Sequence, residues 1–261
     1  MFMVIDTARL RDLLWKGWVI LLEMLQHPKE IPTLFFAILK GAHPGELVRI
    51  TRNLGWLQRA RFNTLIDVGA GVGQFSMAWL TFFPHSRVYA FEPLEECFRI
   101  LEQKLRGRNE SKAFNIALGN HDGEIEFWKS AFVEASSPLK MTAKHAEAFP
   151  WSARMNSIKV PMMKLDSILP SLDLRHPVLM KIDVQGYELE VLKGAEETLK
   201  NVTALVVETS FEELYKDQPL FEDVYTWLTS RGFKYTGSWD QLKNPKTGEI
   251  IQQDAIFLKT L

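Results

Sequence analysis

The chain has 261 residues, of which 46% are hydrophobic and 24% are charged, and its formal net charge is −1. This composition is typical of a soluble globular protein with a sizeable core, and it excludes a largely disordered chain. Because the chain has no excess of positive charge, we expect no binding of nucleic acid. A single cysteine, Cys97, excludes an intramolecular disulfide and a cysteine-based metal cluster.

Residues 1–60 are predicted to form a helical extension before the main domain. Apolar residues recur at three- and four-residue steps between residues 10 and 25, which indicates an apolar stripe on a helix. Pro32 is expected to open a second helix, and after a break at residues 43–45 a third helix is predicted over residues 46–57. We favour packing of the extension against the main domain; the alternatives are a cap and an anchor that contacts a membrane surface peripherally.

Trp15 and Trp18 are the interfacial residues of that anchor. A membrane-spanning helix is not expected, because the most apolar early stretch, residues 13–25, contains Lys16 and Glu23 and is shorter than the roughly 20 residues that a bilayer requires. The same stretch lacks the cleavage site of a secretory signal. The expected location is therefore the cytoplasm.

Residues 61–261 are predicted to form one α/β domain. Short apolar runs alternate with helical patterns, which is typical of a doubly wound, mostly parallel sheet with helices on both faces. Seven strands are expected, the last two as an antiparallel pair, over Thr64–Val68, Arg87–Phe91, Ala113–Ala117, Val178–Ile182, Val202–Val207, Phe233–Ser238 and Ala255–Lys259. The expected helices cover Phe75–Phe83, Leu94–Leu105, Tyr187–Leu199 and Leu220–Ser230.

Two further segments interrupt this alternation. Gly123–Trp128 is predicted as an added edge strand. Residues 130–157 have no clean period, so an irregular insertion is expected there. Such an insertion is either an active-site lid or a surface loop without a role, and the pattern leaves both interpretations open.

A glycine-rich loop follows the first predicted strand. Asp67 ends the strand, and Gly69, Gly71 and Gly73 precede the next helix. Glycines at a strand-to-helix turn permit positive φ angles and close approach of a ligand, and the helix N-terminus attracts an anion. A nicotinamide site uses the same corner with the spacing G-x-G-x-x-G, but here the third glycine comes one residue earlier. We therefore favour S-adenosylmethionine, whose carboxylate suits the helix start.

The sequence also offers candidate residues for binding the ammonium group, the ribose and the adenine of this cofactor. Asp67 is expected to orient the amides of the loop and the ammonium of the cofactor. Glu92 ends the second strand, where a carboxylate can accept two hydrogen bonds from a ribose diol; the alternative is an exposed Glu that caps the next helix. Asn115 and Ala117, at the end of the third strand, are expected beside the adenine.

A second motif follows the fourth strand and carries a family resemblance. Asp183 stands at the carboxyl end of that strand, where ligands bind in open α/β sheets. Through residues 66–73, residues 91–93 and, most specifically, residues 181–188, the sequence resembles the FkbM family of S-adenosylmethionine-dependent methyltransferases. The family usually has Glu where this chain has Gln185, a departure that removes the acid from this position.

The resemblance, which covers about residues 64–257, implies O-methylation of a hydroxyl on a sugar, polyketide or related metabolite. It implies that the cofactor contacts fall on Asp67, Glu92 and the three glycines of the loop. It also places Glu208, after the fifth strand, near the acceptor. The expected partner is therefore a small molecule or a glycan, and the oligomeric state is not predicted.

Methyl transfer to a hydroxyl is helped by a base within hydrogen-bond reach. Asp183 is the first candidate, with His145 and Glu208 as alternates. Asp183 and Glu208 together are also a candidate site for a divalent cation, which we do not favour. Lys181 is expected to face away from Asp183, because strand residues alternate between faces. A nicotinamide oxidoreductase and a non-catalytic binding module are the competing functions.

Overall fold

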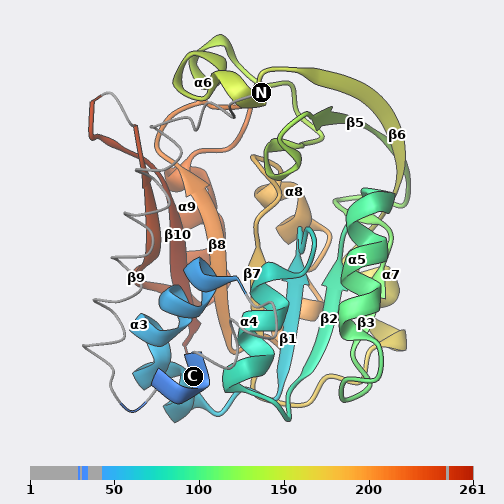
Figure 1. Ribbon diagram of the computed structural model, residues 1–261, viewed down its shortest axis with the longest axis vertical. Helices are drawn as coiled ribbons and strands as arrows, with labels where there is room; N and C mark the ends of the chain where they lie inside the picture. Colours follow the sequence, from blue (N-terminus) through green and yellow to red (C-terminus); the bar gives the residue numbers. More distant parts are fainter. Residues whose placement is uncertain (1–28, 30, 35–42, 245–246, 261) are drawn as a thin grey trace, which may run out of the picture.

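The computed structural model describes residues 29, 31–34, 43–244 and 247–260. Its centre is a seven-stranded sheet in the order β3-β2-β1-β7-β8-β10-β9 (Figure 1). The strand β10 is antiparallel to both of its neighbours, and the other pairs are parallel. The strands are β1 (Thr64–Val68), β2 (Arg87–Phe91), β3 (Lys112–Phe114), β7 (Val178–Ile182), β8 (Ala204–Ser210), β9 (Phe233–Lys243) and β10 (Ile250–Lys259). The predicted α/β fold is thereby confirmed.

Helices cover both faces of the sheet because the central strands are apolar on both sides. All five residues of β1 are buried, and consecutive residues point to opposite faces, so Leu65 and Ile66 belong to different core clusters. One face carries α3 (Pro44–Ala60), α4 (Gln74–Phe82) and α5 (Glu95–Leu105). The other face carries α7 (Leu165–Ile168), α8 (Glu188–Lys193) and α9 (Phe221–Thr229).

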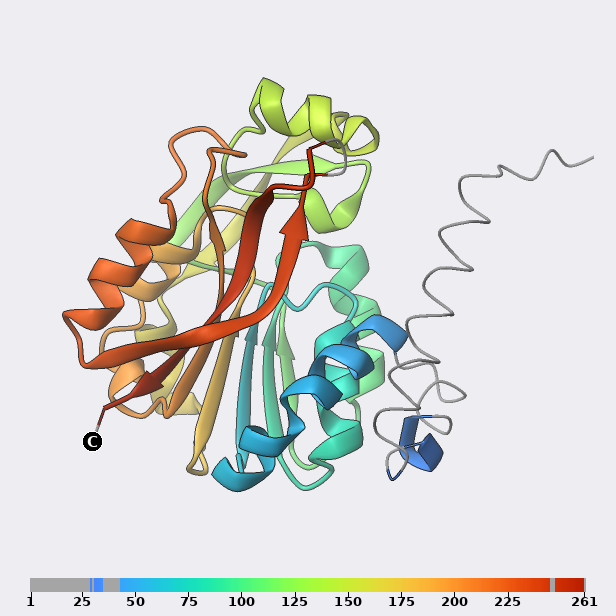
Figure 2. The same cartoon turned by 90° about the vertical axis from the view of Figure 1, so that its left-hand side faces the viewer.

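The helix α3 packs against the domain, as expected for this part of the N-terminal extension. Its residues Leu47, Ile50, Leu54 and Leu57 are buried in the same core cluster as β1 and α4. Figure 2 shows α3 beside α4. The helix begins at Pro44, inside the predicted break, since proline is well tolerated in the first turn of a helix.

The predictions for residues 1–28, which include the apolar stripe, Trp15 and Trp18, lie outside the described residues. A short helical segment over residues 31–34 agrees with the helix expected at Pro32. Within the described ranges, no helix combines the length and the apolar character that crossing a bilayer requires.

The predicted third strand, Ala113–Ala117, is wrong as a single element. The strand β3 ends at Phe114, and the pairing with β2 stops there because Pro93 has no N–H and the side chain of Asn115 donates to the carbonyls of Glu92 and Pro93. Residues Ala117–Leu118 form β4, which belongs to a separate three-stranded sheet in the order β4-β6-β5.

That second sheet also corrects the expectation of an added edge strand. Gly123–Trp128 is part of β5 (Gly123–Ser130), which pairs antiparallel with β6 (Met155–Met163) and does not join the main sheet. The segment between them is more regular than predicted, since it contains η2 (Val133–Ala135) and α6 (Ala143–Ala148). In Figure 1 this unit lies above the carboxyl ends of the parallel strands.

Candidate active site

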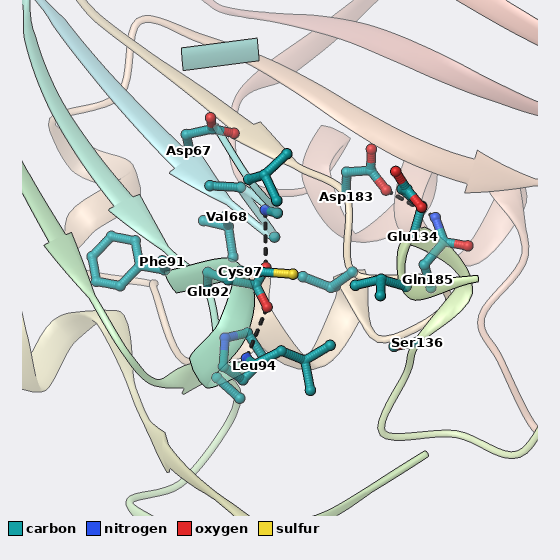
Figure 3. Close-up of a pocket in the computed structure, with 18 of the residues that line it drawn as sticks. Asp67, Val68, Phe91, Glu92, Leu94, Cys97, Glu134, Ser136, Asp183 and Gln185 are labelled. Atoms are coloured by element: carbon teal, nitrogen blue, oxygen red, sulfur yellow. Dashed lines mark hydrogen bonds between the residues drawn. The ribbon is translucent and has the colours of Figure 1, made fainter. Parts of the chain in front are cut away.

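A cavity of about 500 Å³ opens at the carboxyl ends of β1, β2 and β7 (Figure 3). Its walls come from the loop after β1, from the turns after β2 and β7, from β4, and from η2 of the insertion. This volume is within the range of pockets that enclose a small molecule or cofactor. The insertion therefore forms one wall of the site.

The three glycines of the first loop have different roles. Gly69 and Gly71 line the cavity and have positive φ angles of 77° and 54°. At Gly69 a Cβ atom would lie 1.9 Å from the backbone oxygen of Asp183, so this glycine permits close packing of the two functional loops. Gly73 caps α4 at a φ of 81° and lies outside the cavity lining, where a Cβ atom would lie 2.9 Å from Leu101 Cδ1. Its observed role is thus to shape the start of α4.

Asp67 is fully buried at the base of the cavity. Its Oδ2 accepts a hydrogen bond from Ser76 Oγ at 2.6 Å, whereas its Oδ1 is buried and has no partner among the described residues. Burial raises the pKa of Asp67, against the opposing positive charge of Lys181. The expectation that Asp67 orients the loop amides is not met, since Ser76 is its partner. A buried carboxylate oxygen without a partner favours a positive charge beside it.

Glu92 lies at the carboxyl end of β2 and lines the cavity. Its Oε2 accepts from the backbone N–H of Gly71 at 2.9 Å, and its Oε1 accepts from that of Leu94 at 2.8 Å. Only 6% of the residue is exposed, so the alternative of an exposed capping Glu does not hold. Burial raises the pKa of Glu92 to about 7, although both backbone hydrogen bonds oppose the rise. Each carboxylate oxygen keeps a lone pair for a ribose hydroxyl.

Beyond Glu92 the cavity wall becomes apolar. Ile116, Ala117, Leu118 and Cys97 line it, which gives a flat base an apolar surface. Asn115 is not part of this lining, because its amide group binds the backbone of the preceding turn. Of the two residues expected beside the adenine, the structure therefore brings only Ala117 to the cavity.

Replacing Glu92 with Gln is expected to weaken binding of S-adenosylhomocysteine by about 10-fold to 100-fold, because a charged acceptor for the ribose diol is lost. Since an ionised carboxylate accepts stronger hydrogen bonds from hydroxyls than a protonated one and the pKa of Glu92 is about 7, the affinity of the wild type should rise as the pH increases through 7. This rise should be smaller in Glu92→Gln. Calorimetric titration at pH 6 and pH 8 measures both effects.

Glu96→Gln is the matched control, because Glu96 also lines the cavity but pairs with Lys129. We expect it to leave the affinity within about twofold of the wild type, as is usual for an exposed ion pair. Equal losses in Glu92→Gln and Glu96→Gln would contradict the assignment of the ribose to Glu92.

Asp183 follows β7, and its backbone N–H continues the ladder by donating to Val68 at 3.0 Å. Its carboxylate faces the cavity between two donors: Lys181 Nζ lies 2.9 Å from Oδ2, and Gln185 Nε2 lies 2.9 Å from Oδ1 (Figure 3). The expectation that Lys181 faces away was wrong. Residues two apart on a strand share a face, so Lys181 and Asp183 point the same way.

The surroundings shift the pKa values of Asp183 and Glu208 in opposite directions. Burial opposes ionisation of Asp183, but the charge of Lys181 and the hydrogen bonds from Lys181 and Gln185 lower its pKa overall. Burial, together with the charges of Asp183 and Glu188, raises the pKa of Glu208 well above its ordinary value. The surroundings therefore favour the ionised form of Asp183 and the protonated form of Glu208.

Gln185 connects the two acids. Its Nε2 donates to Glu208 Oε2 at 2.8 Å as well as to Asp183, and its Oε1 lies 2.9 Å from the hydroxyl of Tyr215. The residue has a φ of 58°, which is uncommon for a side chain of this size. The space between Asp183 and Glu208, where a divalent cation was considered, thus contains an amide group. No group of three or more potential metal ligands occurs within the described ranges.

The two alternate bases lie away from the cavity surface. Glu208 does not line the cavity and is separated from it by Gln185. His145, on α6, packs edge-on against Phe149 and Tyr215, with ring centres 5.3 and 5.0 Å apart. Burial lowers the pKa of His145, and its Nδ1 has no partner among the residues with described positions. Of the three predicted bases, the structure presents only Asp183 to a ligand.

Three residues of this site were absent from the sequence-based candidates. Lys181 was set aside through the argument on strand faces, and Tyr215 comes from a loop without a motif. Glu46 lines the cavity from α3, in the extension to which no site role was given. Strand periodicity was sufficient to place Lys181 on the same face as Asp183. No local sequence pattern identifies Tyr215 or Glu46 as site residues.

Comparisons with known proteins agree with these features. Residues 67–235 match the model of the methyltransferase FkbM domain. The 2-O-methyltransferase NoeI of Sinorhizobium fredii is 23% identical over 181 residues, which are 67% of this chain and 74% of that protein. The hexuronic acid methyltransferase AglP of Haloferax volcanii is 29% identical over 147 residues, which are 56% of this chain and 55% of that protein.

Among solved structures, an S-adenosylmethionine-dependent methyltransferase from Clostridium acetobutylicum aligns with a TM-score of 0.45 at 10% identity, over 86% of this chain and 95% of that chain. The domain match supports a methyltransferase over both competing functions, the nicotinamide oxidoreductase and the non-catalytic module.

Proposed function

The chain belongs to the FkbM family of S-adenosylmethionine-dependent methyltransferases, and we propose that it methylates a hydroxyl group of a sugar or glycan. The observation that carries this proposal is the Asp183 carboxylate, which lies in the cavity wall and is kept ionised by Lys181. An ionised carboxylate accepts a hydrogen bond from a hydroxyl and orients it for reaction. One relative is named as a 2-O-methyltransferase, which supports transfer to oxygen, and another as a hexuronic acid methyltransferase, which supports a sugar-derived acceptor.

The cavity fits the cofactor of the family at both ends. The unpartnered Asp67 Oδ1 suits an ammonium group, and the lone pairs of Glu92 suit a ribose diol. Apolar residues from Ile116 to Leu118 suit the adenine. When bound, S-adenosylmethionine supplies an activated methyl group, and the protein has to align the acceptor with it.

Asp183 performs two tasks in this mechanism. Its carboxylate orients the acceptor hydroxyl toward the cofactor, and it accepts the proton of that hydroxyl as the new bond forms. A lowered pKa does not prevent the second task, because an oxygen that is gaining a third bond becomes a much stronger acid than a carboxylic acid. Lys181 and Gln185 keep the carboxylate in place throughout, since each binds one of its oxygens.

The charge of the cavity favours a neutral acceptor. Besides Asp183, the cavity wall contains Asp67, Glu92, Glu46, Glu96 and the exposed Glu134. Among the described lining residues the one basic side chain is that of Lys181, which is already paired with Asp183. An anionic acceptor would be repelled by these carboxylates, so we expect a neutral sugar in place of a uronic acid.

An acceptor panel tests this proposal. The protein is incubated with methyl-labelled S-adenosylmethionine and matched sets of neutral sugars, uronic acids and hydroxylated metabolites without a sugar. The expected result is labelled product from neutral sugars, with lower kcat/KM for the uronic acid of the same ring geometry. Labelling confined to the metabolites without a sugar would contradict the proposed acceptor class.

A further inference from the structure

The helix α3 places a carboxylate in the wall of the cofactor cavity. Glu46, in its first turn, lines the cavity and is only 8% exposed. The helix precedes the stretch of residues 67–235 that matches the family model. It lies against α4 (Figure 2), whose first residues, Gln74 and Phe75, line the same cavity.

Glu46 is held in one orientation by a chain of ion pairs. Arg49 Nη1 donates to Glu46 Oε1 at 2.6 Å, and Arg49 Nε donates to Asp240 Oδ2 of β9 at 2.5 Å. Asp240 also lies beyond the matched stretch. Because one guanidinium binds both acids, the position of the Glu46 side chain depends on α3 and β9 together. Within the described part of the chain, no hydrogen bond is made by the second oxygen, Oε2.

The position of Glu46 identifies the end of the cofactor that it faces. The apolar wall for the adenine and the Glu92 carboxylate for the ribose belong to β4, β2 and the turn after β2, whereas Glu46 belongs to α3 and is close enough to Asp67 and Lys181 to affect the pKa of each. The negative charge of Glu46 contributes to the raised pKa of Asp67 and to that of Lys181, as expected for neighbouring groups. Glu46 is therefore close to the buried Asp67 oxygen that has no partner.

Glu46 shares the charge of Arg49 with Asp240, and Asp67 has, among the described residues, only the neutral Ser76 as a hydrogen-bond partner, so the cavity that Glu46 and Asp67 line favours a further positive charge. Lys181 does not fill this role alone, because its ammonium group is bound to Asp183 at 2.9 Å. The amino-acid end of S-adenosylmethionine carries an ammonium group, which matches the two acids in charge and in hydrogen-bond donors. We propose that Glu46 is a cofactor-binding residue, and that it binds this ammonium group together with Asp67.

This inference requires the cofactor but not the sugar acceptor. A binding experiment without any acceptor therefore separates it from the proposed function. Three ligands isolate the amino-acid end: S-adenosylmethionine, S-adenosylhomocysteine, which lacks the sulfonium charge, and 5′-methylthioadenosine, which lacks the amino-acid group as well as the charge.

In Glu46→Gln, calorimetric titration should show the Kd values of S-adenosylmethionine and S-adenosylhomocysteine raised by the same factor, about 10-fold to 100-fold, as for loss of a charge-assisted hydrogen bond. The Kd of 5′-methylthioadenosine should stay within about twofold of the wild type, since this ligand does not reach Glu46. Glu95→Gln, in an exposed ion pair of α5 outside the cavity lining, should change none of the three values.

Each other outcome would overturn the inference. A weaker 5′-methylthioadenosine complex in Glu46→Gln would mean that Glu46 only supports the shape of the cavity. An effect on S-adenosylmethionine alone would assign Glu46 to the sulfonium, and no effect on any ligand would remove it from the site. If Glu46→Gln does not fold, Glu46→Asp keeps the charge on a shorter side chain, and it should weaken only the two ligands with an amino-acid group.

Discussion

Replacing Asp183 with Asn is expected to lower kcat by about 10²-fold to 10⁴-fold, the usual contribution of a positioned acid or base. The substitution keeps the size of the side chain but removes the charge that orients the hydroxyl and accepts its proton. The affinity for S-adenosylhomocysteine should change by no more than about threefold, because the cofactor contacts lie on Asp67 and Glu92. Steady-state kinetics with a saturating acceptor and calorimetry measure the two effects separately.

Glu208→Gln is the control for this experiment. Glu208 lies behind Gln185 and its surroundings favour the protonated form, which a neutral amide resembles. We expect kcat to stay within about fivefold of the wild type. A larger loss in Glu208→Gln than in Asp183→Asn would assign the catalytic role to Glu208, and an unchanged rate in Asp183→Asn would remove Asp183 from the mechanism.

Replacing Lys181 with Met is expected to destabilise the fold by about 3–5 kcal/mol, the usual consequence of removing one partner from a buried ion pair. The side chain of Lys181 is only 10% exposed, and its charge is close to those of Asp183, Asp67 and Asp254. Methionine fills a similar volume, so the loss measures the uncompensated carboxylates. Chemical denaturation, followed by circular dichroism, gives the free energy of unfolding.

The loss should depend on pH in a defined direction. In the wild type the pKa of Asp183 is below that of the unfolded chain, so its stabilising effect is present above the unfolded pKa and is lost as the pH falls. Without Lys181, burial raises the pKa of Asp183, and stability falls as the pH rises. The difference between the two proteins should therefore be larger at pH 8 than at pH 5.

Lys193→Met is the matched control, because Lys193 pairs with Glu190 on the protein surface and is 43% exposed. Its free energy of unfolding should change by no more than about 0.5 kcal/mol. Similar losses for the two lysine variants, or a Lys181→Met loss that is the same at both pH values, would show that the buried carboxylates do not need Lys181.

Much of the cofactor end of this site was predictable from the sequence, because glycines and acids at strand ends have local causes. A buried strand followed by alternating glycines marks a tight turn, and Gly69 and Gly71 do line the cavity. The sequence explained only in part why position 69 has to be glycine. Gly69 permits contact with the backbone of Asp183, which is far away in the sequence. A local sequence pattern cannot predict such a long-range contact.

The acceptor end was less predictable, because long-range packing decides it. Gln185 bridges Asp183 and Glu208 only because β7 and β8 are neighbours in the sheet. From the sequence, His145 was expected in an irregular loop. In the structure it is buried, because its ring packs against Tyr215. Glu46 reaches the cavity only because α3 packs on α4.

The chemical nature of the transferred methyl group tests the central claim most directly. The protein is incubated with methyl-labelled S-adenosylmethionine and a neutral oligosaccharide acceptor, and the product is divided between alkali treatment and acid hydrolysis followed by mass spectrometry. Methylation of a hydroxyl oriented by Asp183 predicts a label that survives alkali and appears as an O-methyl monosaccharide. A label released by alkali, as from a methyl ester, or attached to nitrogen would contradict the account.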